Sequence, residues 1–346
     1  MKNTKLTVNI IELVPKEWTV EEVDDNLFKV YYINKGRGNS PKPIILPKEI
    51  NISNKLIEGM SMYIGDGKLS KDLGHLEFTS KDFDLLNFMR NFFERILLQK
   101  VNRIRKRNNA YSFQLSSKIL RIIFGTIVEK VLAVDYSLEP KLRKAFLRGI
   151  FAAEGSVNIQ KKENYLAYLG IHLSYEKEKE LANLVSSLLN LEGVSHKQFS
   201  RPNKGERYIQ ITGWENYFKA NQMNLFSLSK RKTQQFQDHL NSRKLYFNIN
   251  SDFLNIILKE QNKRQLAFEI NEDYNALRRR IVKKSLGKEQ MKKICALFSI
   301  SKKEILPFVN TIKIWNSSPI KNRETINYVI DKYLPDKIKN HKTWLP

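Results

Sequence analysis

Cysteine is almost absent from this chain, since Cys295 is the single cysteine among 346 residues. One thiol cannot form an internal disulfide or build a cysteine-cluster zinc site. The five histidines do not have the spacing of a zinc site either. No glycine-rich phosphate loop is present, which argues against an NTPase.

Long apolar runs are also missing, because no stretch approaches the ~20 residues that a membrane-spanning helix needs. The first residues, Met-Lys-Asn-Thr-Lys, lead into mixed polar sequence without the apolar segment of a signal peptide. We therefore expect an intracellular protein of the cytoplasm, nucleoid or organelle matrix, neither secreted nor bound to a membrane.

Acidic residues are scarce relative to basic ones: 36 Asp and Glu oppose 60 Lys and Arg, a net charge of +24. Such an excess predicts a polyanionic partner, nucleic acid first. The basic residues are interspersed with apolar ones, so they are expected on folded surfaces. The length allows two or three domains with proper cores.

One short pattern occurs twice. Residues 61–67 read Ser-Met-Tyr-Ile-Gly-Asp-Gly, and residues 149–155 read Gly-Ile-Phe-Ala-Ala-Glu-Gly. Small residues four apart let two helix backbones approach closely, and a glycine after the acid can take the left-handed conformation that stops a helix. The pattern predicts that Asp66 and Glu154 lie side by side where two packed helices end, an oxygen cluster suited to Mg²⁺.

At these residues the chain resembles the LAGLIDADG homing endonucleases of the monomeric, two-motif kind. Residues 147–156, Leu-Arg-Gly-Ile-Phe-Ala-Ala-Glu-Gly-Ser, are similar to the second motif, and residues 59–67 to a common variant of the first. Ser61 stands where glycine is usual in the family. The resemblance covers roughly residues 50 to 240.

The order of predicted elements also repeats, as helix, two strands, helix, two strands, helix. In the first copy these are expected at 53–65, 68–80, 82–99, 101–107 with 111–115, and 117–132. In the second they are expected at 141–153, 155–160 with 166–174, 176–191, and 194–200 with 207–212, followed by helices after Gly213. Glu154 follows Asp66 by 88 positions, about one small module, which indicates an internal duplication.

These patterns predict an α+β fold of two pseudo-twofold-related αββαββα modules, packed through the motif helices into a DNA-binding saddle of antiparallel sheets, with a mainly helical C-terminal domain. The expected domains are a small strand-rich N-terminal extension at 1–50, the first module at 51–138, the second at 139–245, and a basic domain at 246–346.

One face of each sheet is expected to be wet and to follow a DNA groove, with Arg and Gln reading base edges. The predicted contacts there are Arg103, Arg105, Arg107, Gln114, His75, His172, Arg201, Arg207 and Gln210. An ordinary solvated sheet surface is the competing interpretation.

The C-terminal region contains two short helical patterns, 263–270 and 274–284, separated by the polar residues 271–273, which is the spacing of a helix-turn-helix. The second pattern would offer DNA the side chains of Asn275, Arg278, Arg279 and Lys283. A helical cap with a charged face is the alternative.

The family resemblance implies a divalent-metal nuclease that makes staggered cuts with short 3′ overhangs. Asp66 and Glu154 would hold Mg²⁺ or Mn²⁺ together with backbone at Gly65 and Ala153, and Ca²⁺ would bind without supporting cleavage. It also implies a polar or basic residue after the second strand of each half; the matching positions are Ser80 with Lys81, and Glu176 with Lys177.

Three functions follow. The first is a monomeric, site-specific endonuclease acting on double-stranded DNA with a long asymmetric target. The second is a DNA-binding transcriptional regulator of the same fold that does not cleave. The third is a maturase that binds intron RNA, for which the basic residues 230–232 and 278–280 are candidates.

Overall fold

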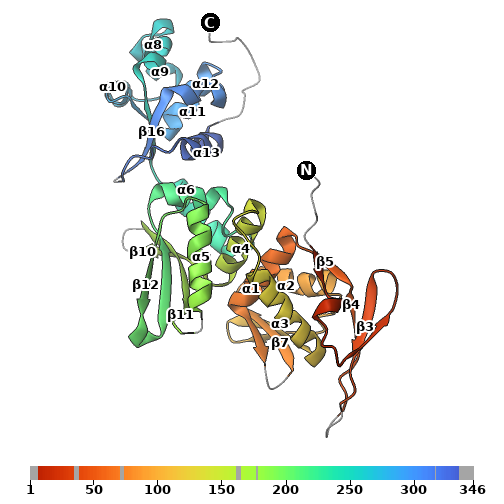
Figure 1. The fold of residues 1–346 in the computed structure, drawn as a ribbon. Helices are drawn as coiled ribbons and strands as arrows, with labels where there is room; N and C mark the ends of the chain where they lie inside the picture. The colour runs from red at the N-terminus through yellow and green to blue at the C-terminus, as the bar shows by residue number, and fades with distance from the viewer. Residues whose placement is uncertain are drawn as a thin grey trace. The chain divides into compact units, whose positions relative to one another are not determined.

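The computed structural model describes residues 7–34, 39–70, 74–160, 165–176, 178–315 and 317–334 (Figure 1). The chain divides into two compact units: residues 1–211 with 223–236 form one, and residues 212–222 with 237–346 form the other. In these described ranges no helix has the length and apolar character needed to cross a membrane.

The first unit begins with short strands. β1 (Thr7–Asn9) pairs with β5 (Glu49–Asn51), and β2 (Thr19–Glu22), β3 (Leu27–Tyr31) and β4 (Ile44–Pro47) form a separate antiparallel sheet, with the short 3-10 helix η1 at Ile11–Leu13. Phe28, Val30 and Leu46 are fully buried, because alternate residues of β3 face one side of the sheet.

The first repeat follows. Its elements are α1 (Asn54–Asp66), β6 (Gly67–Ser70), β7 (His75–Ser80), α2 (Phe83–Ile96), β8 (Ile104–Arg107), β9 (Ala110–Ser116) and α3 (Lys118–Leu132). The four strands form an antiparallel sheet in the order β6-β7-β9-β8. Ser53 and Ser117 cap α1 and α3 by accepting backbone hydrogen bonds, so serine fixes where each helix starts.

The second repeat has the same order. Its elements are α4 (Pro140–Ala153), β10 (Gly155–Gln160), β11 (Tyr165–Ser174), α5 (Lys179–Leu191), β12 (His196–Arg201), the 3-10 helix η2 (Pro202–Lys204) and β13 (Glu206–Ile211). The strand order β10-β11-β13-β12 repeats that of the first sheet. The α+β class and the duplication expected from the sequence are therefore confirmed.

Two helices follow this sheet. α6 (Trp214–Gln222) belongs to the second unit, whereas α7 (Lys230–Ser242) begins in the first unit and ends in the second.

The rest of the second unit combines helices with a small sheet. Its elements are β14 (Leu245–Ile249), α8 (Ser251–Glu260), α9 (Lys263–Glu269), α10 (Tyr274–Val282), β15 (Ser285–Gly287), α11 (Lys288–Leu297), α12 (Lys302–Ile305), η3 (Leu306–Phe308), β16 (Val309–Ile314) and α13 (Arg323–Tyr333). β14 lies between β15 and β16 in an antiparallel sheet. Helices predominate here as expected, and the sheet is an addition to that expectation.

Candidate active site

The two motif helices, α1 and α4, pack so closely that their small residues are required. A Cβ atom added to Gly149 would lie 1.9 Å from Ser61 Oγ and 2.4 Å from the carbonyl oxygen of Glu58. A Cβ atom added to Gly65 would lie 2.6 Å from the Cβ of Ala153. These distances are shorter than van der Waals contact, so larger residues would push the helices apart.

A buried ion pair fixes the register of this seam. Arg148 on α4 lies 2.6 Å from the carboxylate of Glu58 on α1, and the two side chains are only 16% and 11% exposed. Breaking such a pair would leave an uncompensated buried charge. The pair therefore favours one alignment of α1 against α4.

The seam brings the two motif acids to one end. Asp66 is the last residue of α1, and Glu154 directly follows α4. Burial raises the pKa of Asp66 to about 6, although the positive charge of Lys232 opposes the shift. Burial, followed by the negative charges of Asp66 and Glu178, raises the pKa of Glu154 to about 7. Close to neutral pH, Glu154 therefore exchanges a proton readily.

The glycine after each acid does not adopt the conformation expected from the sequence. Gly67 is extended, with φ −92° and ψ 158°, and Gly155 has no positive φ either, so that expectation is wrong. The reason for glycine is space. A Cβ atom at Gly67 would lie 2.4 Å from the carbonyl oxygen of Tyr63, and one at Gly155 would lie 2.2 Å from that of Phe151.

A buried ammonium group lies beside the acids. Lys232, near the start of α7, is 6% exposed, and its Nζ donates to the carbonyl oxygens of Ala152 (2.5 Å), Ala153 (2.9 Å) and Phe151 (3.3 Å). These are the last carbonyls of α4, where the helix dipole favours a positive charge. Burial lowers the pKa of Lys232 to about 8, and the charge of Asp66 opposes that shift.

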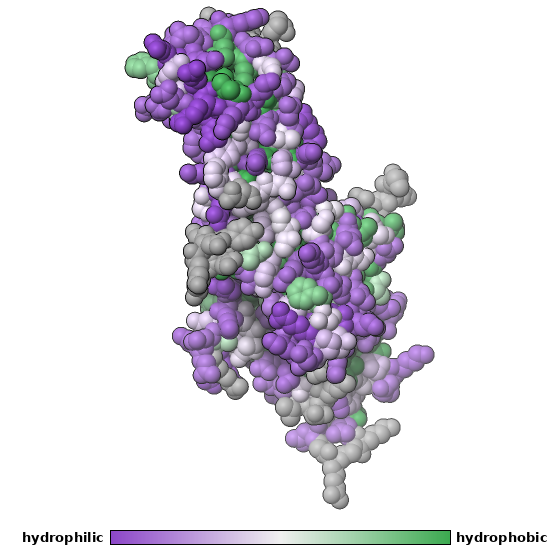
Figure 2. All heavy atoms as spheres, turned by 90° about the vertical axis from the view of Figure 1, so that its left-hand side faces the viewer, coloured by the Kyte–Doolittle hydropathy of each residue, from purple (hydrophilic) through white to green (hydrophobic). Residues whose placement is uncertain are grey.

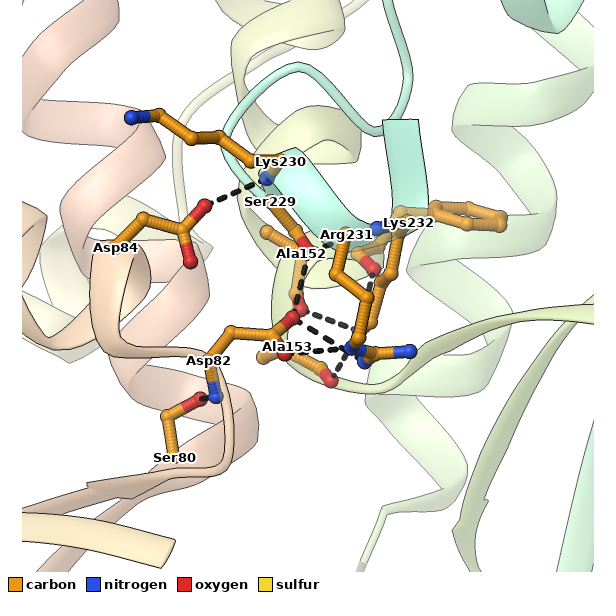
Figure 3. A network of polar contacts seen from close by, with 10 residues as sticks. Ser80, Asp82, Asp84, Ala152, Ala153, Ser229, Lys230, Arg231 and Lys232 are labelled. Atoms are coloured by element: carbon orange, nitrogen blue, oxygen red, sulfur yellow. Dashed lines mark hydrogen bonds and ion pairs between the residues drawn. The ribbon is translucent and has the colours of Figure 1, made fainter. Parts of the chain in front are cut away.

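The segment before Lys232 is held by two carboxylates of the first repeat (Figure 3). Asp82 accepts hydrogen bonds from Ser229 Oγ and Arg231 Nε, each at 2.6 Å, and Asp84 accepts one from the backbone N–H of Lys230 at 2.6 Å. Burial alone would raise the pKa of Asp82, but these hydrogen bonds and the positive charge of Arg231 lower it. Asp82 therefore stays ionised and anchors the start of α7.

A cavity of about 320 Å³ opens between these groups. The polar side chains that line it belong to Asp66, Thr79, Ser80, Lys81, Asp82, Arg231 and Lys232. Ser80 and Lys81, singled out from the sequence, thus lie around the same cavity as Asp66. In the second half, Glu176 is exposed, and Lys177 lies outside the described residues.

Oxygen atoms dominate the donor set around the acids, which fits a hard divalent cation such as Mg²⁺. Asp66 and Glu154 contribute carboxylates, and the backbone at Gly65 and Ala153 adjoins them. Within the described ranges there is no group of three or more Asp, Glu, His or Cys side chains that could hold a metal. A cation here would therefore need further oxygen ligands from water or from phosphate.

A comparison with protein families decides what this repeat is. Residues 141–241 match the family profile described as LAGLIDADG-like domain. The second repeat is a LAGLIDADG-like domain. The match includes α4, Glu154 and Lys232, and the resemblance inferred from the motif is thereby confirmed for this part of the chain. The first repeat pairs its own motif helix with that of the LAGLIDADG-like domain and has the same strand order.

Individual proteins are similar over parts of the chain. The "Probable cell division protein WhiA" of Clostridium novyi (strain NT) is 26% identical over 140 residues, which cover 37% of this chain and 42% of that protein. The match therefore spans less than half the length of that curated relative. Among solved structures, I-DmoI in complex with DNA and Mn is 23% identical with a TM-score of 0.36, covering 47% of this chain and 91% of that one. Full-length DUF199/WhiA from Thermatoga maritima is 15% identical with a TM-score of 0.40, covering 82% and 93%.

The predicted DNA contacts of the first sheet differ in exposure. Arg103 and Arg105 are exposed, as is Gln114, whose amide donates to Ser116 Oγ at 3.3 Å. His75 is buried, at 7% exposure. Arg107 ends β8, and its side chain is outside what the structure describes. Hydrophilic side chains are widespread on the face shown in Figure 2.

In the sheet of the LAGLIDADG-like domain, the two arginines predicted to contact DNA lie against aromatic rings. The guanidinium of Arg201 is 5.0 Å from the ring centroid of Tyr208, and that of Arg207 is 5.0 Å from the ring of Tyr175. His172, which is exposed, packs edge-on against Tyr208. Gln210 is half-buried on β13. Such contacts orient cationic side chains before any ligand is bound.

The two helical patterns predicted to form a helix-turn-helix correspond to α9 and α10 of the second unit. Asp273 caps α10 by accepting the backbone N–H of Ala276 at 2.8 Å. Two residues of α10 are buried, Leu277 and Ile281, and this anchors the helix on its inner side. The four residues predicted to contact DNA are all exposed: Asn275, Arg278, Arg279 and Lys283.

Sequence reasoning did not place Lys232, Arg231 or Asp82 at the acids. From the sequence, the basic run 230–232 is only a candidate RNA-binding surface, and Asp82 is only the first residue of a predicted helix. Arg231 and Asp82 are 149 positions apart. The basic run 230–232 was therefore the available signal in the sequence. The acidic residue that binds it, Asp82, lies in the first repeat.

Proposed function

We propose that this chain is a site-specific endonuclease that hydrolyses double-stranded DNA with a divalent metal, leaving short 3′ overhangs. The observation that carries the proposal is the pair of half-buried carboxylates, Asp66 and Glu154, at one end of the seam beside the buried ammonium of Lys232. Burying like charges together costs free energy, which a purely structural helix end does not require.

Asp66, Glu154 and the adjoining backbone would hold Mg²⁺ or Mn²⁺. When bound, such a metal neutralises phosphoryl oxygens and lowers the pKa of a water.

The cationic side chains around the cavity would attract the negatively charged phosphodiester. Lys232 holds positive charge between Asp66 and Asp82, and it lies on the same cavity as Lys81. Arg231 keeps its side chain 59% exposed although Asp82 binds it, so its guanidinium can also meet a phosphate. Together these residues offset the negative charge that develops on a phosphoryl group under attack.

Binding would extend beyond the cavity. Exposed arginine and glutamine side chains on the two sheets can contact phosphates and base edges, and α10 offers a second basic surface. The partner would be duplex DNA with a long asymmetric target, read by a monomer whose halves differ in sequence. Intron RNA is the alternative polyanion.

A non-cleaving DNA-binding regulator is the second candidate. The observation that favours it is the position of Lys232. Its ammonium donates a hydrogen bond to the carbonyl oxygen of Ala153, one of the backbone groups expected to bind the metal. An internal cation could stabilise the acids with no metal present.

One experiment distinguishes the endonuclease from the non-cleaving regulator. A library of randomised duplexes is incubated with Mg²⁺ and the wild-type protein, with Asp66→Asn/Glu154→Gln, or with Asp25→Asn as an exposed acid-to-amide control. An endonuclease yields discrete staggered products in the wild type and the control that vanish in the double variant. Specific duplex binding without products in all three would favour the regulator, and selective binding of intron RNA would favour a maturase.

A further inference from the structure

The sheet of the second repeat carries a cluster of aromatic rings on one face. His172 of β11 and Phe199 of β12 both pair with Tyr208 of β13, so the three side chains form one row across the sheet. The ring of Tyr208 meets the imidazole edge-on, with 4.4 Å between centroids, and stacks on the ring of Phe199 at 5.1 Å. Tyr168 extends the cluster, because a Cβ atom added to Gly170 would lie 2.9 Å from its ring.

The aromatic cluster faces away from the core. Ile209 and Ile211 of β13 are fully buried, and Tyr208, which precedes Ile209, belongs to the opposite side of the strand. On that side His172 is exposed and Phe199 is half-buried. This is the face that the sequence predicts to lie in a DNA groove.

The first sheet has polar side chains in the equivalent row. The glycine after Asp66 pairs with Phe78, and the glycine after Glu154 pairs with Ile171, so Phe78 and Ile171 are equivalent. The next residue of each strand begins the row in question. In the first sheet that row consists of two hydroxyls and a guanidinium, from Thr79, Ser112 and Arg105. The two sheets thus offer different chemistry at the same level: hydrogen-bonding groups in the first and ring carbon in the second.

The aromatic cluster presents carbon rather than charge to a ligand. The hydroxyl of Tyr208 donates to the carboxylate of Glu206, and the guanidinium of Arg201 lies 5.0 Å from the centroid of the same ring. Burial lowers the pKa of His172, so that ring is uncharged near neutral pH. Lys197, which is exposed and pairs with the next residue but one after Tyr208, adds a cation on the same face.

An apolar centre with cations beside it fits the major groove of duplex DNA where thymine is present. Phosphates flank the groove, and the 5-methyl group of thymine is its apolar feature, which cytosine lacks. Aromatic side chains such as phenylalanine contact that methyl group. Unpaired bases would instead need an exposed ring face on which to stack, and Tyr208, at the centre of the row, is only 6% exposed.

We propose that the aromatic cluster recognises thymine through its 5-methyl group, so that one half of the target is read by methyl contacts and the other by hydrogen bonds to the first sheet. The inference rests on the proposed binding of duplex DNA, and it holds for the endonuclease and for the regulator alike. Removing one methyl-sized group from water is worth about fourfold in affinity. Phe199, half-buried at the edge of the row, is the residue that determines this specificity.

Deoxyuridine tests the contact, because it lacks the methyl group of thymidine and keeps the same hydrogen-bonding groups. The whole chain is titrated by fluorescence anisotropy with a duplex selected from the randomised library, and with the same duplex carrying uracil for thymine in one half or the other. We expect uracil to weaken binding about fourfold per contacted methyl group, in one half only. Equal binding of all duplexes, or equal losses in both halves, would overturn the inference and leave the DNA-binding proposal intact. No specific duplex binding would overturn both.

Two truncations assign the effect to the aromatic cluster. Phe199→Ala should remove most of the difference between thymine and uracil. Arg105→Ala, at the equivalent position of the first sheet, is the matched control and should weaken binding to both duplexes alike. Thermal melts check that each variant is folded. A difference of wild-type size in folded Phe199→Ala would contradict the inference.

5-Methylcytosine gives a test by gain of function that needs only the wild-type protein. Replacing a sensitive thymine–adenine pair by cytosine–guanine should weaken binding, and a methyl group on C5 of that cytosine should restore about fourfold. The same methyl group in the insensitive half should change nothing. An absence of gain in the sensitive half would overturn the inference. So would tighter binding of the single strand than of the duplex that is lost in Phe199→Ala, because the cluster would then take unpaired bases.

Discussion

Removing the charge of Glu154 should stabilise the folded protein, by an amount that grows as the pH rises from about 4.5 to 7. Burial raises the pKa of Glu154 from 4.5 to about 7. At about 1.4 kcal/mol per pKa unit, ionising this group in the folded state costs about 3 kcal/mol more than in the unfolded chain. Glu154→Gln has nearly the same shape but never ionises, so it avoids this cost.

The sign of the pH dependence follows from the raised pKa. Below about pH 4.5, Glu154 is protonated in the folded and the unfolded chain, and the variant should match the wild type. As the pH rises towards 7, the wild type loses stability that the variant keeps. At pH 8 the variant should be more stable by up to about 3 kcal/mol.

Hydrogen exchange of the slowest amides in α1 and α4 measures this difference, because it reports on the unit that contains the acids. The experiment compares wild type, Glu154→Gln and Glu260→Gln, an exposed control, at pH 5, 6.5 and 8. A difference that does not grow with pH, or a variant less stable than the wild type at pH 8, would refute the argument from burial.

Three further predictions concern the seam and the surface. Lys232→Met removes the donor to the last carbonyls of α4 and the cation beside the acids, so it should abolish cleavage and lower stability by about 1–3 kcal/mol; unchanged unfolding would contradict this. Gly149→Ala should destabilise the first unit by several kcal/mol, whereas Gly125→Ala, whose added Cβ meets no atom nearer than 3.8 Å, should stabilise it by up to ~1 kcal/mol in thermal melts. DNA affinity should fall steeply with salt, and Arg278→Ala/Arg279→Ala should reduce the slope of log K against log salt by about 2; an unchanged slope in fluorescence anisotropy titrations would place the DNA elsewhere.

The positions of the two motif helices and of their acids could be predicted from the sequence, because the patterns that indicate them are local. Helix periodicity, small residues at the seam and a carboxylate at the same point of each repeat placed Asp66 and Glu154 together. The alternating strands 111–115 and 207–212 indicated sheets with one polar face. Patterns of period two and period 3.6 do not depend on distant partners.

The rest depended on contacts across the chain. Lys232 reaches α4 from about 80 positions away, and nothing in a basic run tells whether it faces solvent or a buried acid. The glycine after each acid was also explained by the wrong property: space for a neighbouring carbonyl, and not a positive φ, requires it. The sequence does not predict the small sheet of the second unit, because β14 is almost wholly buried and therefore lacks the alternation of polar and apolar residues.

The ion pair between Glu58 and Arg148 makes the two repeats no longer interchangeable. At the spacing that relates Asp66 to Glu154, the counterpart of Glu58 is Phe146 and the counterpart of Arg148 is Met60. If two copies of the chain exchanged halves so that a first repeat met another first repeat, Glu58 would be buried against methionine with no partner, at a cost of several kcal/mol. The ion pair thus favours packing of a first repeat against a second repeat, which keeps two unlike halves together in one chain.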